Sequence, residues 1–275
     1  MKKALLIPAS MCFALLVVLT GCSSGGGSTN VSGVGGTSGG GTTGGGGATG
    51  PNSLLNGQYA FSFSGTATAT GNPVILAGSF KADGAGDITA GVEDYNEISF
   101  VNGVSSVLLQ GVSLKGTYSI GSDGRGTLTF TNFNPNQVFK FAVETNNHGQ
   151  LIRFDSAASG SGTFDLQTTS AFSLSALQHG SYAFDWNGTD SAGNPYSAIG
   201  AFNLSGGSAS GGAADLNDNE PAGGTYVQDT VVGTLQPPDT NGHGTATITY
   251  GSTTYAYGYD IVSASRILLM QTDAI

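Results

Sequence analysis

The most constraining feature of this sequence is an internal repeat. The segment Gly57-Gln58-Tyr59-Ala60-Phe61 returns as Gly180-Ser181-Tyr182-Ala183-Phe184. In both copies aromatic residues alternate with small or polar ones, and the alternation continues to Phe63 in the first copy and to Trp186 in the second. Successive side chains of a strand point to opposite faces, so each copy is predicted to open on a half-buried β-strand.

Further segments follow in the same order in both copies. Gly71-Asn72-Pro73 matches Gly193-Asn194-Pro195, Asp94 and Asn96 match Asp215 and Asn217, Asp123–Thr127 matches Asn241–Thr245, and Phe139, Phe141 and Val143 match Tyr255, Tyr257 and Tyr259. This self-similarity predicts two tandem copies of one module.

The first copy predicts about eight strands joined by short turns. They cover residues 57–65, 74–83, 86–95, 106–114, 115–121, 126–132, 137–145 and 149–155, with 161–167 completing or replacing one of them. Asp-Gly turns such as Asp83-Gly84 tolerate the positive φ of tight hairpins, and no window after the leader has a helical period. The predicted fold class is all-β, with two antiparallel meanders that each form an up-and-down β-barrel, β-sandwiches being the alternative. The G-x-Y-x-F opening resembles the G-x-W start of lipocalin-like and avidin-like barrels.

The N-terminus indicates export. Lys2 and Lys3 precede the apolar run Ala4–Leu19, which is typical of a signal peptide. The run ends in Leu19-Thr20-Gly21-Cys22, which resembles the lipobox of bacterial lipoproteins. The resemblance implies that residues 1–21 are removed and that Cys22 is acylated, with palmitate among the expected chains. An ordinary secretory signal and a transmembrane anchor are the alternatives.

The residues after the lipobox predict where the protein lies. Ser23 follows Cys22 where an Asp would, by the rule of that family, favour the inner membrane, so the outer membrane of the cell envelope is the expected location. Residues 23–50 are almost entirely Gly, Ser and Thr, too poor in apolar side chains to fold. They predict a flexible tether with a span of about 30 Å. The whole arrangement resembles Gly-rich, repeat-built envelope lipoproteins, a resemblance that implies no activity.

The charge of the chain limits its partners. The formal charge is −10 and becomes −12 without Lys2 and Lys3. An acidic surface with few basic residues excludes nucleic acid as the expected partner and argues against electrostatic docking on anionic lipid. The membrane is therefore expected as a partner only through the N-terminal lipid. Cys12 leaves with the leader and Cys22 is modified, so no thiol remains for a metal, and no cofactor is predicted.

The predicted domain boundaries follow from these segments. Residues 1–21 form the signal peptide, 22–52 the lipidated cysteine and tether, 53–167 the first module, 168–176 a join and 177–275 the second module. The second module contains Ile267–Gln271 as the counterpart of Leu151–Asp155 but no counterpart of 161–167. It is expected to lack its closing strand, unless the sequence is truncated or the gap is filled by the join or by a partner chain. An open edge of this kind favours self-association.

Two acidic clusters and three histidines are the candidate reactive groups. The acidic clusters are Glu93, Asp94 and Glu97 in the first module and Asp215, Asp218 and Glu220 in the second, and the histidines are His148, His179 and His243. The acidic spacing fits no EF-hand loop, so solvated strand ends are preferred over a Ca²⁺ site or a hydrolase carboxylate pair. The histidines lack H-x-x-x-H spacing and are expected to be solvated turn residues. No catalytic residue and no metal site is predicted.

The aromatic residues are predicted to belong to the core. Tyr255, Tyr257 and Tyr259 share one face of a strand, as do Tyr182, Phe184 and Trp186. Facing inward they would fill a small barrel, and facing outward they would form a strip for binding sugars or proteins. The apolar residues at the matching positions of the first copy favour the inward arrangement.

The sequence is compatible with three functions. The leading hypothesis is a non-enzymatic, lipid-anchored envelope protein whose two β modules bind an unknown protein or glycan partner or have a structural role. The second is a lipocalin-like carrier of a small apolar ligand, which needs a hollow barrel. The third is a glycan-active surface enzyme, which needs two carboxylates converging in one cleft.

Overall fold

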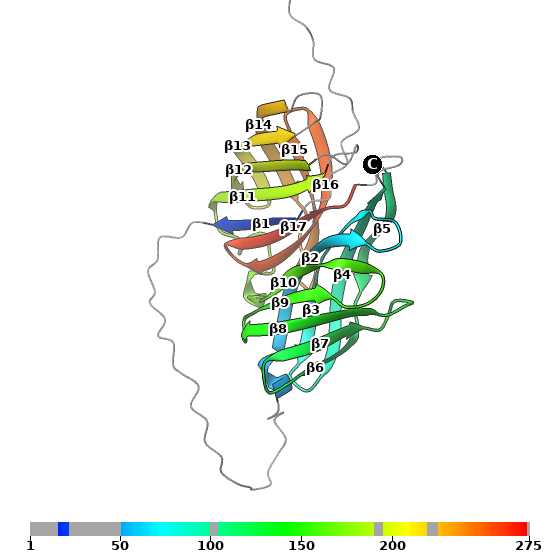
Figure 1. Ribbon diagram of the computed structural model, residues 1–275. Coiled ribbons are helices and arrows are strands. Elements are labelled where there is room, and N and C mark those ends of the chain that lie inside the picture. Colours follow the sequence, from blue (N-terminus) through cyan, green and yellow to red (C-terminus); the bar gives the residue numbers. More distant parts are fainter. Residues whose placement is uncertain (1–15, 22–50, 100–103, 190–194, 219–224, 274–275) are drawn as a thin grey trace, which may run out of the picture.

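The computed structural model describes residues 16–21, 51–99, 104–189, 195–218 and 225–273. The prediction of an all-β chain with two tandem antiparallel modules is confirmed (Figure 1). Among the described residues the helical elements are two short 3-10 turns, η1 (Pro51–Leu54) and η2 (Thr169–Ala171). No helix in these parts of the chain has the length and apolarity needed to span a membrane.

Nine strands form the first module, close to the predicted positions. They are β2 (Asn56–Ala67), β3 (Pro73–Asp83), β4 (Asp87–Ser99), β5 (Val104–Ser113), β6 (Gly116–Ile120), β7 (Arg125–Phe130), β8 (Gln137–Thr145), β9 (His148–Arg153) and β10 (Ala158–Leu166). β5 and β6 pair with successive parts of the same strand, β4. β3 pairs with β4 as well as with β2, and β10 pairs with β2, so the pairings run right around the module.

The second module repeats this meander. Its strands are β11 (Gly180–Thr189), β12 (Pro195–Ser205), β13 (Ser208–Asp218), β14 (Thr225–Leu235), β15 (His243–Tyr250), β16 (Thr253–Ser263) and β17 (Arg266–Gln271). The gap predicted beside β17 is filled by β1 (Leu16–Gly21), which pairs antiparallel with β17 and with β11 and closes an eight-stranded barrel. The closing strand therefore comes from the apolar N-terminal segment and not from the join.

Strand register and hydrogen bonds define which residues of the two modules are equivalent. Phe61 lies opposite Gly78 and Gly78 opposite Glu93, just as Phe184 lies opposite Gly200 and Gly200 opposite Ala214. Gly126 lies opposite Phe141, and Gly244 opposite Tyr259. Val138 N–H donates to Asp155 as Ala256 N–H donates to Asp273.

This equivalence corrects the sequence alignment near the C-terminus by two residues. Phe139, Phe141 and Val143 correspond to Tyr257, Tyr259 and Ile261, and Leu151–Asp155 corresponds to Leu269–Asp273. The alternating aromatic pattern fits both registers equally well. The glycine opposite the aromatic ring decides between them, since a Cβ on Gly126 or Gly244 would collide with the ring of Phe141 or Tyr259.

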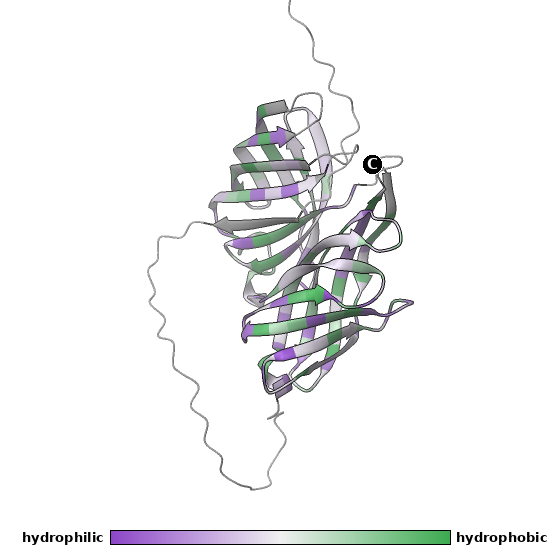
Figure 2. Ribbon diagram, in the orientation of Figure 1, coloured by the Kyte–Doolittle hydropathy of each residue, from purple (hydrophilic) through white to green (hydrophobic). Residues whose placement is uncertain are grey.

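Apolar side chains fill the interior of each module. Figure 2 shows that hydrophobic residues are spread along the strands of both modules. Tyr182, Phe184 and Trp186 are buried in the second core together with Tyr257 and Tyr259, so the inward arrangement of the aromatics is confirmed. The first core is equally aromatic, and its fully buried large side chains are Tyr59, Phe61, Phe63, Phe80, Phe130, Phe139 and Phe164. Neighbouring rings lie 5.4–6.2 Å apart between centroids, which is contact distance for aromatic pairs.

The two modules meet along a buried seam. It joins the outer face of β2–β4 to the outer face of β16 and β17, and two apolar clusters cross it. They are Ile75, Ala77 and Ile98 with Met270, and Ala60 with Val262 and Leu268. Gln167 donates from its side chain to Ile261 O at 2.6 Å, and Gln110 donates to Thr272 O at 2.7 Å.

The join at 168–176 packs against the same region. Thr168 N–H donates to Val262 O, and Gln178 N–H just beyond the join donates to Ala264 O. Ala171 and Leu177 are buried in the second core. The join is therefore part of the packed structure, and the modules form one continuous body.

Candidate functional site

Buried polar groups collect at two places, the interior of the first module and the seam. In the interior, Glu93 is 1% exposed and its Oε1 accepts a hydrogen bond of 2.8 Å from Gln137 Nε2. Arg153 extends from β9 into the same region, with its guanidinium 5.1 Å from the Phe139 ring centroid and its Nε bonded to Asp155 at 2.6 Å. Glu93 Oε2, Gln137 Oε1 and Arg153 Nη1 have no hydrogen-bond partner among the residues that the structure describes.

Burial keeps Glu93 in its protonated form at neutral pH. Burial raises the pKa of this carboxyl to about 8, against the opposing effects of the Gln137 hydrogen bond and the charge of Arg153. A buried carboxyl group of this kind is an uncharged hydrogen-bonding residue at pH 7. In the second module Ala214 occupies the equivalent position, so the cluster is specific to the first module.

The other carboxylates of β4 are separated by the pleat. Glu97 faces the interior, where Thr70 Oγ1 and Asn72 Nδ2 donate to its Oε1 at 2.8 and 3.0 Å. Asp94 faces outward into the seam. The expectation that Glu93, Asp94 and Glu97 are solvated strand ends is therefore wrong, because the seam and the barrel cover both faces of β4, leaving these residues 1%, 2% and 8% exposed.

His243 is the centre of the buried polar groups in the seam. Its Nε2 lies 3.7 Å from Asp94 Oδ2 and its Nδ1 lies 3.4 Å from Asp260 Oδ1. The expectation that His243 is a solvated turn residue is therefore wrong, since its side chain is 11% exposed. Burial alone would lower its pKa, but the adjacent Asp260 carboxylate, followed by the charges of Asp94 and Asp239, raises the pKa to about 9. Burial raises the pKa of Asp94 to about 6.

The close approach of the β16 backbone fixes the position of the Asp94 side chain in the seam. A Cβ on Gly258 of β16 would lie 1.7 Å from Asp94 Oδ2, so only glycine leaves room for this carboxylate. Gly111 N–H donates to Asp94 Oδ1 at 2.7 Å. A sequence signal for the seam exists in the two continuous apolar runs Val74–Ala77 and Ile267–Met270, since runs without alternation indicate strands buried on both faces.

The remaining predicted site residues are dispersed. His148 Nδ1 lies 2.7 Å from Asp165 Oδ1, and Asp165 also pairs with Arg266 across the seam at 2.8 Å. His179 is exposed and contacts Ser205 Oγ at 3.1 Å. Asp215 is exposed on β13, while the Asp218 side chain, Glu220 and Cys22 lie outside the described residues. In the described part of the chain, no three His, Cys, Asp or Glu side chains are grouped to hold a metal ion.

Two surface grooves lie on the outer faces that the seam leaves free. One, of about 660 Å³, lies over β7–β9 and includes Arg125, Lys140, Ile152 and Phe154. The other, of about 590 Å³, lies over β11–β14 and includes Asp185, Ile199, Asp215 and Gln228. Ile152, Phe154 and Ile199 are 47%, 60% and 62% exposed, unusually high for large apolar side chains.

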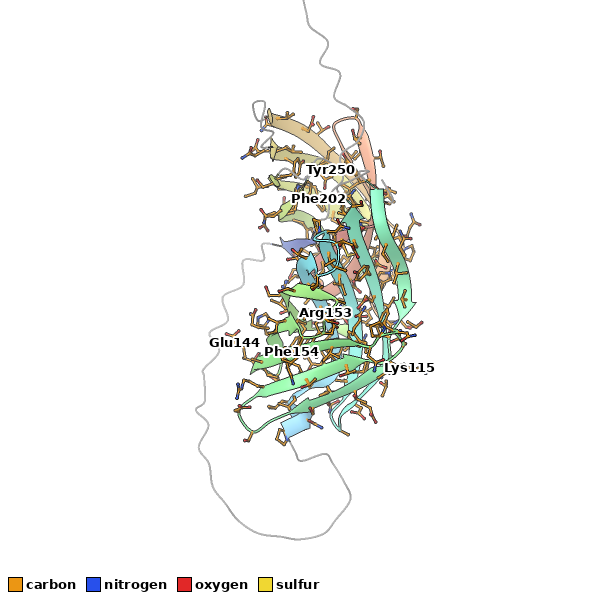
Figure 3. All side chains as sticks on the ribbon, turned by 45° about the vertical axis from the view of Figure 1, so that its right-hand side comes forward. Lys115, Glu144, Arg153, Phe154, Phe202 and Tyr250 are labelled. Carbon is orange, nitrogen blue, oxygen red and sulfur yellow. The ribbon has the colours of Figure 1, made fainter. Side chains whose placement is uncertain are left out.

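Two consecutive residues at the end of β9 have opposite environments. Arg153 lies inside the module, whereas Phe154 lies on its surface (both labelled in Figure 3). Lys140 Nζ lies 5.3 Å from the Phe154 ring centroid and donates to Thr127 Oγ1 at 2.6 Å.

Comparison of the chain with protein-family models, with curated proteins and with solved structures found no match.

Proposed function

We propose that this chain is a non-enzymatic, lipid-anchored protein of the bacterial cell envelope that presents its two β modules for binding or structural interaction. The observation that carries the proposal is Leu19-Thr20-Gly21-Cys22 at the end of an apolar leader, followed by the tether at 23–50. The outer membrane is the proposed location, with attachment through the acylated Cys22.

The packed interiors support a binding or structural role over the carrier alternative. A carrier needs an open volume inside a barrel, and ligand cavities typically measure several hundred Å³. Buried rings of Phe and Tyr occupy the interior of both modules, and the two grooves described above lie on outer faces.

The geometry of the predicted carboxylates of β4 weighs against the glycan-active enzyme. Glu93 and Asp94 are neighbours on β4 and point to opposite faces. Glu93 and Glu97 share the inner face but stand four residues apart, which is about 13 Å along a strand. Paired glycosidase carboxyls need roughly 5–10 Å.

The lipid anchor is tested by the variant Cys22→Ala. Cells fed labelled palmitate should incorporate label into the wild-type chain and not into the variant, because the thiol is the acylated group. On detergent phase separation the wild type should follow the detergent phase. Ser23→Ala is the matched control and should behave like the wild type. Equal labelling of the wild type and Cys22→Ala would overturn the proposal.

A further inference from the structure

The seam joins two different faces of the repeated module. We define the A face as the outer face of the first three strands, which are β2–β4 in module 1 and β11–β13 in module 2. We define the B face as the outer face of β7–β9 in module 1 and of the equivalent strands β15–β17 in module 2. The seam packs the A face of module 1 against the B face of module 2.

The remaining two faces are the grooved ones. The A face of module 2 carries the groove with Ile199 and Asp215, and the B face of module 1 carries the groove with Arg125 and Ile152. Because the modules are copies, each free face is equivalent, residue by residue, to one side of the seam. A contact that is made once within the chain is thus available a second time between chains.

One of the two apolar clusters of the seam, the one around Met270, has apolar equivalents on the free faces. Met270 packs between Ile75 and Ala77 in the seam. By the register equivalence, Ile152 stands at the position of Met270, and Ser197 and Ile199 stand at those of Ile75 and Ala77. Ile152 and Ile199 are therefore two exposed apolar side chains whose counterparts bury each other.

The charged part of the seam is reproduced with stronger charges. His243 faces Asp94 across the seam. The equivalent of His243 is Arg125, and the equivalent of Asp94 is Asp215. Arg125 and Asp215 are both exposed, and Arg125 forms an ion pair of 2.7 Å with Asp123 on the same module. An arginine and an aspartate thus stand where the seam holds a histidine and an aspartate.

The polar contact at the edge of the seam also recurs. Gln110 donates to Thr272 O across the seam, and the equivalent residues are Gln228 and Phe154, one in each groove. Other positions differ: Lys140 replaces Gly258, where the seam allows no Cβ, and Glu144 and Gln150 stand at the positions of Val262 and Leu268. At Lys140 the two faces must therefore lie slightly further apart than in the seam, at a distance that the long Lys140 side chain can span.

From these equivalences we infer that the A face of module 2 binds the B face of module 1 of a second copy of this chain. The contact joins different faces, so it adds chains head to tail and gives a closed ring or an open filament, depending on the rotation between neighbouring chains. The two modules would then alternate along the ring or filament, held by seam-like contacts, as repeats stack in a solenoid. This inference deepens the structural role proposed above but does not need the lipid, so the two can fail separately.

Charge reversal tests the contact. The chain purified in detergent is followed by analytical ultracentrifugation over a dilution series. The wild type should form species larger than one chain in a concentration-dependent manner. Asp215→Arg gives like charges on the two faces, as does Arg125→Asp, so each variant alone should lose association. An equimolar mixture of the two variants should regain it, and so should a chain carrying both substitutions.

Cysteine cross-linking tests the orientation. Residues 53–275 contain no cysteine. A chain with both Ile152→Cys and Ile199→Cys should give a ladder of disulfide-linked oligomers on mild oxidation. Each single-cysteine variant should give no ladder, and these variants also control for Cys12 and Cys22. Leu54→Cys combined with Ile199→Cys is the matched control, because Leu54 is exposed but lies off both faces. A monomeric wild type, or mixing of the charge variants without restored association, would overturn the inference.

Discussion

At the scale of single residues, the side chains on one face of a strand can be buried inside the barrel and those on the other face against the neighbouring module. Alternation in the sequence predicted the inward residues, such as Phe61 and Phe184, and their burial is confirmed. It could not predict that Ser62, on the opposite face, would be 3% exposed in the seam. Nor could it predict the burial of Glu93, since an acidic residue in a strand is expected to face solvent.

Glu93 should make the protein less stable as pH rises. Its folded pKa of about 8 lies above the ordinary value of 4.5. The unfolded chain therefore loses this proton first, and stability falls between pH 4.5 and 8 by up to about 1.4 kcal/mol per pH unit. Asp94 acts in the same direction from pH 3.8 to 6, and His243 from 6.5 to 9 because its charged form is lost.

Glu93→Gln should make this pH profile shallower, because the substitution removes the carboxyl proton and keeps the shape of the side chain. Urea unfolding at several pH values between 5 and 9 measures the slope. Asp87→Asn, a change at an exposed carboxylate of the same strand, serves as the control and should keep the wild-type slope. A Glu93→Gln profile as steep as that of the wild type would show that the carboxyl is ionised in the fold.

At the scale of elements, turn residues and alternation predicted the strands of module 1 to within a few residues, except the C-terminal end of β4. The break between β5 and β6 was also anticipated as two strands, at 106–114 and 115–121. What the sequence could not predict is the origin of the closing strand of module 2. Strand pairing is non-local, and an apolar leader has no alternation that distinguishes a strand from a membrane-directed segment.

The contribution of β1 can be measured in the unprocessed chain. Replacing both Val17 and Val18 by proline should lower the unfolding midpoint, because neighbouring residues of a strand direct their N–H groups to opposite sides and one of the two faces β17. Val17→Ala with Val18→Ala is the control, since it keeps both N–H groups and should cost less. Equal effects of the two double substitutions would mean that backbone pairing by β1 does not hold the barrel closed.

At the scale of the whole molecule, the contacts across the seam should make the two modules unfold together. Gly258→Ala should separate them, because the new Cβ would collide with Asp94 and overpacking of this kind costs about 1–3 kcal/mol. Calorimetry should show a single transition for the wild type and two for the variant.

The collision itself is isolated by a double-mutant cycle. Gly258→Ala should cost less in a chain that already carries Asp94→Ala, because the carboxylate it would meet is gone. If the two costs simply add, the close approach of β16 to Asp94 is not what couples the modules.

Because β1 lies directly before Cys22, barrel closure and the proposed cleavage compete for the same residues. Residues 16–21 cannot lie between β11 and β17 and in the cleft of a processing peptidase at the same moment, because both need the same extended backbone. Under the proposed processing, a leader that pairs with β11 and β17 early would protect its own cleavage site. A leader that is cleaved early would leave the second barrel without its closing strand. The ratio of the folding rate to the cleavage rate would then set the fraction of chains in which β1 closes the second barrel.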